Sequence, residues 1–188
     1  LVGPRSATLD SGGAVPAVRL NASGTAVRGL TIAGSDRDAA GVVLTEHADS
    51  SAVERTHISG FGTAVETAGN ESVVRGTRVL VDGMDPVVTV TASAVEVSQN
   101  RLSPSAGSSD PASAGIALSD APGVLISDNT IGLVQDDVDE AEQPAIRILD
   151  NESLKNGFAI RNNLDAELPD NSSDPLLNGQ AIPGTKRG

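Results

Sequence analysis

Apolar and polar residues alternate in short segments along this chain, and the segments return at a steady spacing. One segment has an apolar residue, an intervening residue and a second apolar residue, replaced by Thr67 in the third copy. Its six copies are Val18 to Leu20, Val42 to Leu44, Val65 to Thr67, Val88 to Val90, Ile116 to Leu118 and Ile146 to Ile148, spaced 24, 23, 23, 28 and 30 residues apart. A second segment follows each by about ten residues, at Val27 to Ile32, Val53 to Ile58, Val74 to Val79, Val97 to Leu102 and Ile126 to Ile131, with a weaker copy near Leu154 to Ile160.

These segments are rich in Val and Ile and are separated by Gly, Asn, Asp and Ser, which is typical of strands and turns and not of helices. A repeat of two short strands cannot bury its own apolar face. Parallel stacking of successive copies about 4.8 Å apart does bury it. The pattern therefore predicts an all-β solenoid.

The corners between the segments differ in length. The corner after the first segment is short, as in Ala22 to Thr25, whereas the other corner grows from Ser35–Asp38 to Ser103–Asp110 and to Val134–Glu140. Insertions on one side of a solenoid project from one face, which is often its binding face. Gly3 to Gly13 resembles the last part of a preceding coil, and the pattern dissolves near Asp165. We therefore expect a β-helix domain over 1–164, beginning in mid-coil, and an irregular tail over 165–188.

The stretch Gly115 to Ile131 resembles one coil of the right-handed parallel β-helix repeat proteins. This superfamily includes the pectate-lyase-like folds, the NosD-like proteins and repeats of carbohydrate-binding and sugar-hydrolysing proteins. The resemblance extends over about 14–164 and implies a single-stranded, right-handed parallel β-helix of about six coils. It does not imply one function, because such repeats occur in lyases, hydrolases, adhesins and phage tailspikes.

Composition restricts the chemistry of the chain. It has no cysteine, so disulfides and thiol-ligated metals are excluded, and Phe61 and Phe158 are its only aromatic residues. The net charge is −12, with only Lys155 and Lys186 as lysines. Such a surface suits a halophilic protein, because molar salt shortens the Debye length to about 3 Å and screens the self-repulsion. The alternative is an ordinary acidic protein. Nucleic acid is not an expected partner, and no apolar run approaches the roughly 18 residues of a membrane span.

Stacking turns each position of the coil into a column along the solenoid. One column is mostly polar and contains Leu30, Thr56, Thr77, Asn100 and Asn129, with Asn163 as a looser match. Asn tolerates the left-handed backbone of turns, and stacked Asn side chains bond to each other and to the corner backbone. Each such bond contributes about 1 kcal/mol. We interpret Thr56, Thr77, Asn100 and Asn129 as a structural ladder.

Two outward columns carry cations. The first reads Arg28, Glu54, Arg75, Ser98 and Ser127, which indicates a cross-strand charge ladder. The second reads Thr31, His57, Arg78, Arg101 and Thr130. Basic groups in a row on so acidic a chain suggest a stripe that binds an anionic glycan through charge-assisted hydrogen bonds, with His57, Arg78, Arg101, Arg28 and Arg75 as the candidate ligand-binding residues. The alternative is local neutralisation of neighbouring acidic loops.

No catalytic residue is assigned. Glycoside hydrolases require two carboxylates about 5–9.5 Å apart, and the resemblance implies that lyases of this fold use several acidic residues around calcium beside an Arg or Lys base. Glu66 has no carboxylate neighbour in the outward column of the first segment, which reads Arg19, Val43, Glu66, Thr89, Ala117 and Arg147. His47 and His57 lie in neither a nucleophile pattern nor a metal pattern.

No resident cofactor is expected. Calcium is a candidate only at the loop with Asp136, Asp137, Asp139 and Glu140, which lacks the glycine and terminal glutamate spacing of an EF-hand. The alternative interpretation of this loop is a solvated acidic segment.

Four sequons, at Asn21, Asn70, Asn151 and Asn171, point to the cell exterior. We expect a non-catalytic extracellular or cell-surface segment that acts as a rigid stalk or binding surface, for glycans or other surface proteins. The alternatives are a polysaccharide lyase or hydrolase and a viral tail or capsid component.

Overall fold

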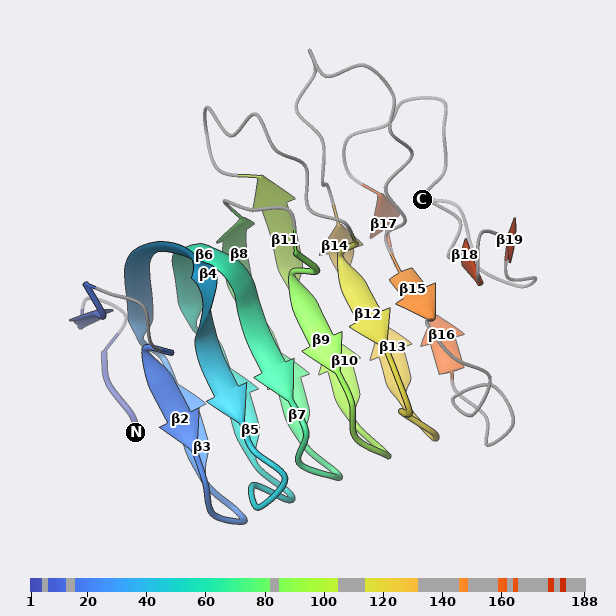
Figure 1. Ribbon diagram of the computed structural model, residues 1–188, viewed down its shortest axis with the longest axis horizontal. Coiled ribbons are helices and arrows are strands. Elements are labelled where there is room, and N and C mark those ends of the chain that lie inside the picture. The colour runs from blue at the N-terminus through green and yellow to red at the C-terminus, as the bar shows by residue number, and fades with distance from the viewer. Residues whose placement is uncertain are drawn as a thin grey trace.

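The computed structural model describes residues 1–4, 7–12, 16–81, 85–104 and 114–131, and five short segments, 146–148, 159–161, 164–165, 176–177 and 180–181. Every regular element in this part of the chain is a β-strand. Successive strands lie side by side along one axis, and the chain winds around that axis (Figure 1). The predicted fold, a right-handed parallel β-helix, is confirmed.

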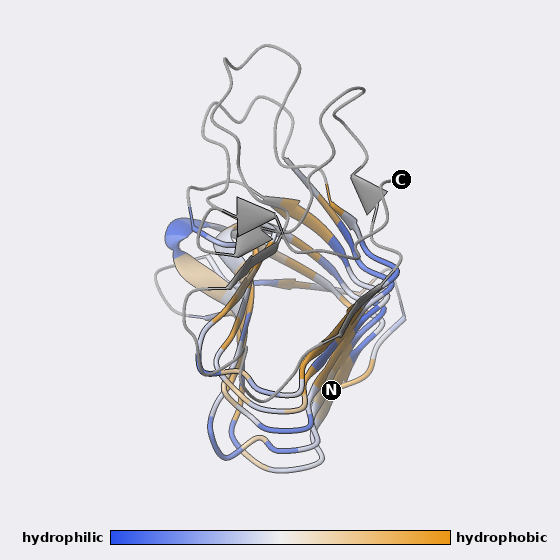
Figure 2. Cartoon of the chain, turned by 90° about the vertical axis from the view of Figure 1, so that its right-hand side faces the viewer, coloured by the Kyte–Doolittle hydropathy of each residue, from blue (hydrophilic) through white to orange (hydrophobic). Residues whose placement is uncertain are grey.

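Each coil has three faces, which enclose the apolar interior (Figure 2). The first face contains β2 (Val18–Leu20), the ends of β4 (Thr31–Leu44) and β6 (His57–Thr67), β9 (Val88–Val90), β12 (Ile116–Leu118), β15 (Ile146–Ile148) and β18 (Leu176–Leu177). The second face contains β3 (Ala26–Arg28), β5 (Ala52–Glu54), β7 (Val73–Arg75), β10 (Glu96–Ser98), β13 (Leu125–Ser127) and β16 (Ala159–Arg161). The third face contains β1 (Thr8–Asp10), the beginnings of β4 and β6, β8 (Arg78–Val81), β11 (Arg101–Pro104), β14 (Thr130–Ile131) and β17 (Leu164–Asp165).

The described residues form about four turns, fewer than the six predicted. The prediction counted every sequence copy as a coil, but the last copy is described only at β15, β16 and β17. At one end, β1 pairs with β4, and Val2 forms a bridge to Arg28. At the other end, two strands lie within the predicted tail. β18 pairs in parallel with β15, and β19 (Gln180–Ala181) runs antiparallel to β18.

Aliphatic side chains stack in register on the inner side of each face. The second face contributes Val27, Val53, Val74, Val97 and Ile126, and each is at most 1% exposed. The third face contributes Ile32, Ile58, Val79, Leu102 and Ile131, and each is at most 2% exposed. Burying a Val, Ile or Leu side chain stabilises the fold by about 1.5–3 kcal/mol, so these stacks hold the coils together.

β4 and β6 pass from the third face to the first without a break in strand structure, and their pairing shifts register between Ala33 and Ala40. Phe61, 2% exposed, packs at this corner. A Cβ atom at Gly34 would lie 2.4 Å from its ring, so glycine at this position makes room for the aromatic side chain.

Two corners use a left-handed backbone at the same position in each coil whose corners are described. Gly24, Ser50, Glu71, Ala94 and Gly123 have positive φ at the corner between the first and second faces. Gly29, Arg55, Gly76, Gln99 and Asp128 have positive φ at the corner between the second and third faces. The repeated backbone geometry keeps the columns aligned from coil to coil.

Candidate functional site

The predicted polar ladder occupies the corner between the second and third faces. The hydroxyl oxygens of Thr56 and Thr77 are 3.1 Å apart. The Thr77 N–H donates to Asn100 Oδ1 at 2.9 Å, and the Asn100 N–H donates to Asn129 Oδ1 at 3.0 Å. All four residues are buried, at 3% exposure or less. The structure therefore brings together Thr56, Thr77, Asn100 and Asn129 as one hydrogen-bonded column inside the corner.

The physical reason given for the asparagines was partly wrong. Asn100 and Asn129 were expected to supply the left-handed turn, but the positive φ lies one residue earlier, at Gln99 and Asp128, both at 57°. The amides bond instead to the neighbouring coils. Asn100 Nδ2 donates to the Val74 carbonyl and to Asn129 Oδ1, each at 2.9 Å, which satisfies backbone groups that strand pairing leaves open at the corner.

The predicted charge ladder on the second face is an ion-pair cluster around Glu54, which is 6% exposed. Arg28 pairs with Glu54 Oε2 from the coil before, and Arg75 pairs with Glu54 Oε1 from the coil after. Burial alone would raise the pKa of Glu54, but the hydrogen bonds and charges of Arg75 and Arg28 outweigh it and lower the pKa below 4.5. Arg28 and Arg75 are therefore committed to this carboxylate and are less available to a ligand than predicted.

The predicted basic stripe is in register on the outside of the third face. His57 lies beside Arg78, and Arg78 lies beside Arg101, on three successive strands. We call these three residues the cation column. Both arginines are exposed, and His57 is half-buried. Over the described part of the chain, neither Arg78 nor Arg101 forms an ion pair.

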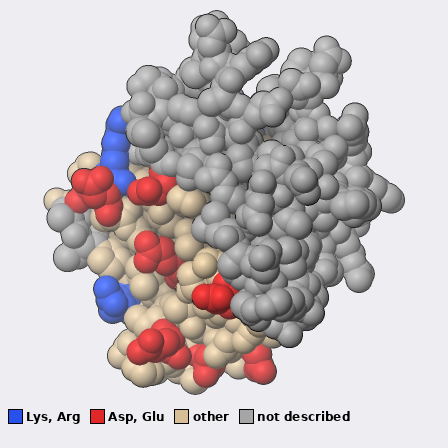
Figure 3. Space-filling view, turned by 45° about the vertical axis from the view of Figure 1, so that its right-hand side comes forward, with Lys and Arg blue, Asp and Glu red and all other residues tan. Residues whose placement is uncertain are grey.

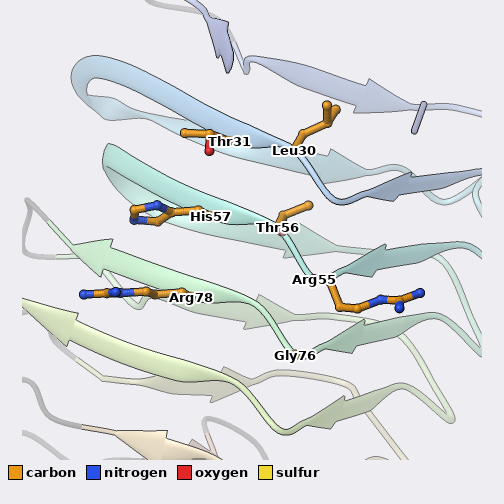
Figure 4. A pocket seen from close by; sticks show the side chains of 7 residues that line it. All are labelled: Leu30, Thr31, Arg55, Thr56, His57, Gly76 and Arg78. Atoms are coloured by element: carbon orange, nitrogen blue, oxygen red, sulfur yellow. The ribbon is translucent and has the colours of Figure 1, made fainter. Parts of the chain in front are cut away.

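A pocket of about 270 Å³ opens beside the cation column, over the corner between the second and third faces (Figure 4). Its lining comes from three successive coils and consists of Leu30, Thr31, Arg55, Thr56, His57, Gly76 and Arg78. Thr31, His57 and Arg78 extend to one side of the corner, and Arg55 extends to the other (Figure 4). The pocket wall thus combines cationic, hydroxyl and apolar groups without a carboxylate.

His57 is the titratable group of this pocket. Burial and the nearby Arg78 charge both lower the pKa of His57 and so favour the neutral imidazole. Its Nε2 atom is shielded from solvent and has no hydrogen-bond partner among the described residues. A buried polar atom without a partner requires a specific explanation.

Arg55 was missed by the sequence analysis, which assigned it no role. The sequence feature that could have identified Arg55 is the alternation of Gly29, Arg55 and Gly76 at one corner position, because a long side chain between two glycines has free space on both sides. Arg55 is exposed and, like the two arginines of the cation column, forms no ion pair with any described residue.

The other predicted positions lie apart from the pocket or outside the described residues. Asn21 and Asn70 are exposed at the corner between the first and second faces, where Asn21 Oδ1 accepts from the Thr45 hydroxyl and Asn70 Oδ1 from the Ser93 hydroxyl. His47 is 3.7 Å from Glu46, and Glu66 is exposed on β6. Positions outside the described residues are Asn151, Asn163, Asn171 and the calcium candidates Asp136, Asp137, Asp139 and Glu140.

Within the described ranges, no three His, Asp or Glu side chains are grouped closely enough to hold a metal ion. A search of the same residues found no helix with the length and hydropathy needed to cross a membrane. Acidic side chains are spread over the described surface that faces the viewer in Figure 3, and basic ones lie at its edge.

Comparison of the chain with models of known protein families, with curated proteins and with solved structures gave no match. The functional interpretation therefore depends on the geometry of this site.

Proposed function

We propose that the chain is a non-catalytic, rigid β-helical segment of the cell exterior, and that it binds an anionic glycan along the third face. The observation that carries this proposal is the presence of Arg78 and Arg101 on the third face and Arg55 at its corner with the second face. These are three exposed cations without carboxylate partners in the described residues, on a chain of net charge −12. By contrast, Arg28 and Arg75 on the second face both pair with the carboxylate of Glu54.

The spacing of the cations favours a linear ligand. Arg78 and Arg101 lie on adjacent parallel strands, so their backbones are about 4.8 Å apart along the solenoid axis. A polysaccharide with a charged group on each unit would present anions in a row along the same axis. Guanidinium groups bind carboxylates and sulfates through paired, charge-assisted hydrogen bonds. Asn21 and Asn70 lie at a different corner of the coil, so sugars attached there would leave the third face free.

The experiment is a calorimetric titration with polygalacturonate, with neutral dextran as the reference polymer, at several salt concentrations. Arg78→Gln and Arg101→Gln should each weaken polygalacturonate binding about tenfold or more, because a charge-assisted bond contributes about 1.5–3 kcal/mol. Arg19→Gln removes the same charge from an exposed position on the first face and serves as the matched control. An equal effect of all three substitutions, or no binding by the unmodified protein, would contradict the proposal.

The enzymatic and viral alternatives make different predictions. A lyase or hydrolase incubated with the polymer would release new reducing ends or unsaturated products. A viral fibre component would show a trimer mass in molar salt. On our proposal, the polymer is recovered intact after binding.

A further inference from the structure

The pocket beside the cation column has a simple cause in the sequence. At the corner position shared by Gly29, Arg55, Gly76 and Gln99, the coils of Gly29 and Gly76 lack a side chain, and Gly76 lines the pocket. A Cβ atom at Gly76 would be 3.4 Å from Arg55 Cγ, so any side chain there would enter the space against which Arg55 lies. On the next coil, Gln99 occupies the equivalent position. The glycine at residue 76 therefore leaves open space that a side chain would fill.

The lining of the pocket selects for an anionic group. Arg55 and Arg78 line it on opposite sides of the corner, with their side chains extending in opposite directions (Figure 4), and none of its seven lining residues is a carboxylate. Its volume of about 270 Å³ is just below the roughly 300 Å³ at which pockets for small organic ligands begin. The pocket therefore exceeds the needs of a single inorganic ion and is close to the size needed for one small polar molecule.

The unpaired Nε2 of His57 is a second, independent feature of the same pocket. Buried imidazole nitrogens in folded proteins normally have a hydrogen-bond partner. The charged neighbour of His57 on the third face is Arg78 of β8, while β4 places the neutral Thr31 on its other side. No carboxylate faces the ring from either strand, so a ligand group is the partner that the site lacks.

We infer that this pocket is a subsite for a single acidic sugar unit, which lies over the corner with Arg55 on one side and Arg78 on the other and whose polar groups reach His57. This inference rests on the proposed glycan binding and assigns it an anchor point. Gly76 is then the residue that determines where along the solenoid the anchor lies.

The test compares Gly76→Asn with Gly123→Asn. Both glycines have positive φ, at 62° and 72°, and Asn tolerates this backbone better than most residues. A Cβ atom at Gly123 has no neighbour closer than 3.7 Å, and Gly123 lies at the other left-handed corner. Gly76→Asn should weaken binding of galacturonic acid at least tenfold, and Gly123→Asn should leave it unchanged. Arg55→Gln, which alters no backbone constraint, should reproduce the loss if Gly76→Asn unfolds.

Four ligands separate the outcomes: galacturonic acid, galactose 6-sulfate, neutral galactose and inorganic sulfate. Binding of both acidic sugars, with a shift of the His57 imidazole proton resonances and no binding of galactose, is the expected result. Inorganic sulfate that binds as tightly as the acidic sugars would overturn the sugar subsite. If Arg78→Gln and Arg101→Gln weaken the polymer but Gly76→Asn changes neither polymer nor monomer binding, the subsite is wrong and the proposed function stands. Monomer binding that is sensitive to Gly76→Asn, without any polymer binding, would keep the subsite and overturn the proposed function.

Discussion

Glu54 has a buried carboxylate whose two oxygens bind arginines from two different coils. Removing it from water is unfavourable, and the two guanidinium groups offset that cost. Their side chains are 47% and 46% exposed, so solvent screens part of the attraction. The pairing therefore contributes moderately to stability, while it fixes how β3, β5 and β7 lie against each other.

Glu54→Gln should lower the free energy of unfolding at pH 7 by about 1–2 kcal/mol, between the values for exposed and buried charged pairs. Because the folded pKa of Glu54 lies below 4.5, its contribution is complete above pH 4.5 and is lost as the pH falls through the folded pKa. Urea denaturation between pH 7 and pH 3 measures both effects. At pH 3 the free energy of unfolding of the unmodified protein should no longer exceed that of the Glu54→Gln variant. As a control, Glu66→Gln at an exposed position should change the free energy of unfolding by less than about 0.5 kcal/mol.

His57 should titrate below pH 6.5 in the folded protein, because burial and Arg78 both disfavour the imidazolium. The folded state then resists protonation, so stability falls as the pH drops below 6.5, where the unfolded chain gains the proton first. Arg78→Gln should raise the pKa of His57, which proton NMR of the two histidines would show. An unchanged pKa of His57 in this variant would show that the Arg78 charge does not affect the imidazole.

At the scale of single elements, the corner ladder links successive coils through side-chain hydrogen bonds. Asn100 satisfies the N–H of Thr77 and the carbonyl of Val74 on the preceding coil, and its Nδ2 also donates to Asn129 Oδ1. Loss of the amide leaves these groups buried without partners.

Asn100→Ala should therefore destabilise the protein by about 2–3 kcal/mol. Gln99→Asn, at the adjacent exposed position with φ 57°, keeps the left-handed turn and should change stability by less than about 0.5 kcal/mol. Thermal unfolding followed by circular dichroism gives both values. Similar losses in the two variants would indicate that the turn backbone, and not the amide, is the critical feature.

The strands were predictable from sequence because inward-facing Val, Ile and Leu return at fixed spacing. The two sequence segments correspond to three faces, because the second segment bends at its middle, between Val27 and Ile32 and again in each later coil. The alternation of apolar side chains alone cannot show this bend. The bend arises from the residue with positive φ that directly precedes each ladder residue, as Arg55 precedes Thr56. The registers of the ladder, the charge ladder and the cation column followed from parallel stacking and are confirmed. The pocket was not predictable, because it depends on an empty space at Gly76.

At the scale of the whole molecule, the net charge of −12 sets the response to salt. Reducing the ionic strength from 1 M to 0.1 M lengthens the Debye length from about 3 Å to about 10 Å, so carboxylates on neighbouring coils repel each other more strongly. We predict that the melting temperature rises steadily with KCl concentration up to the molar range. The melting temperature of the Glu54→Gln variant should rise more steeply with KCl concentration, because this variant lacks an ion-pair attraction that salt weakens. A melting temperature independent of salt would contradict a halophilic origin.

In a parallel β-helix, each coil pairs with its neighbours through the same backbone groups. One whole coil can therefore be deleted, and the flanking coils can still pair with each other. Excision of 65–87 would join β6 to β9 and bring Val88 opposite Val42, so that the inner stacks continue with one layer fewer. Arg101 would then occupy the place of Arg78 beside His57, while Gln99 would cover the opening that Gly76 leaves. The shortened molecule would keep Arg101 beside His57 but lose both Arg78 and the recess, so one excision shortens the row of cations and removes the recess together.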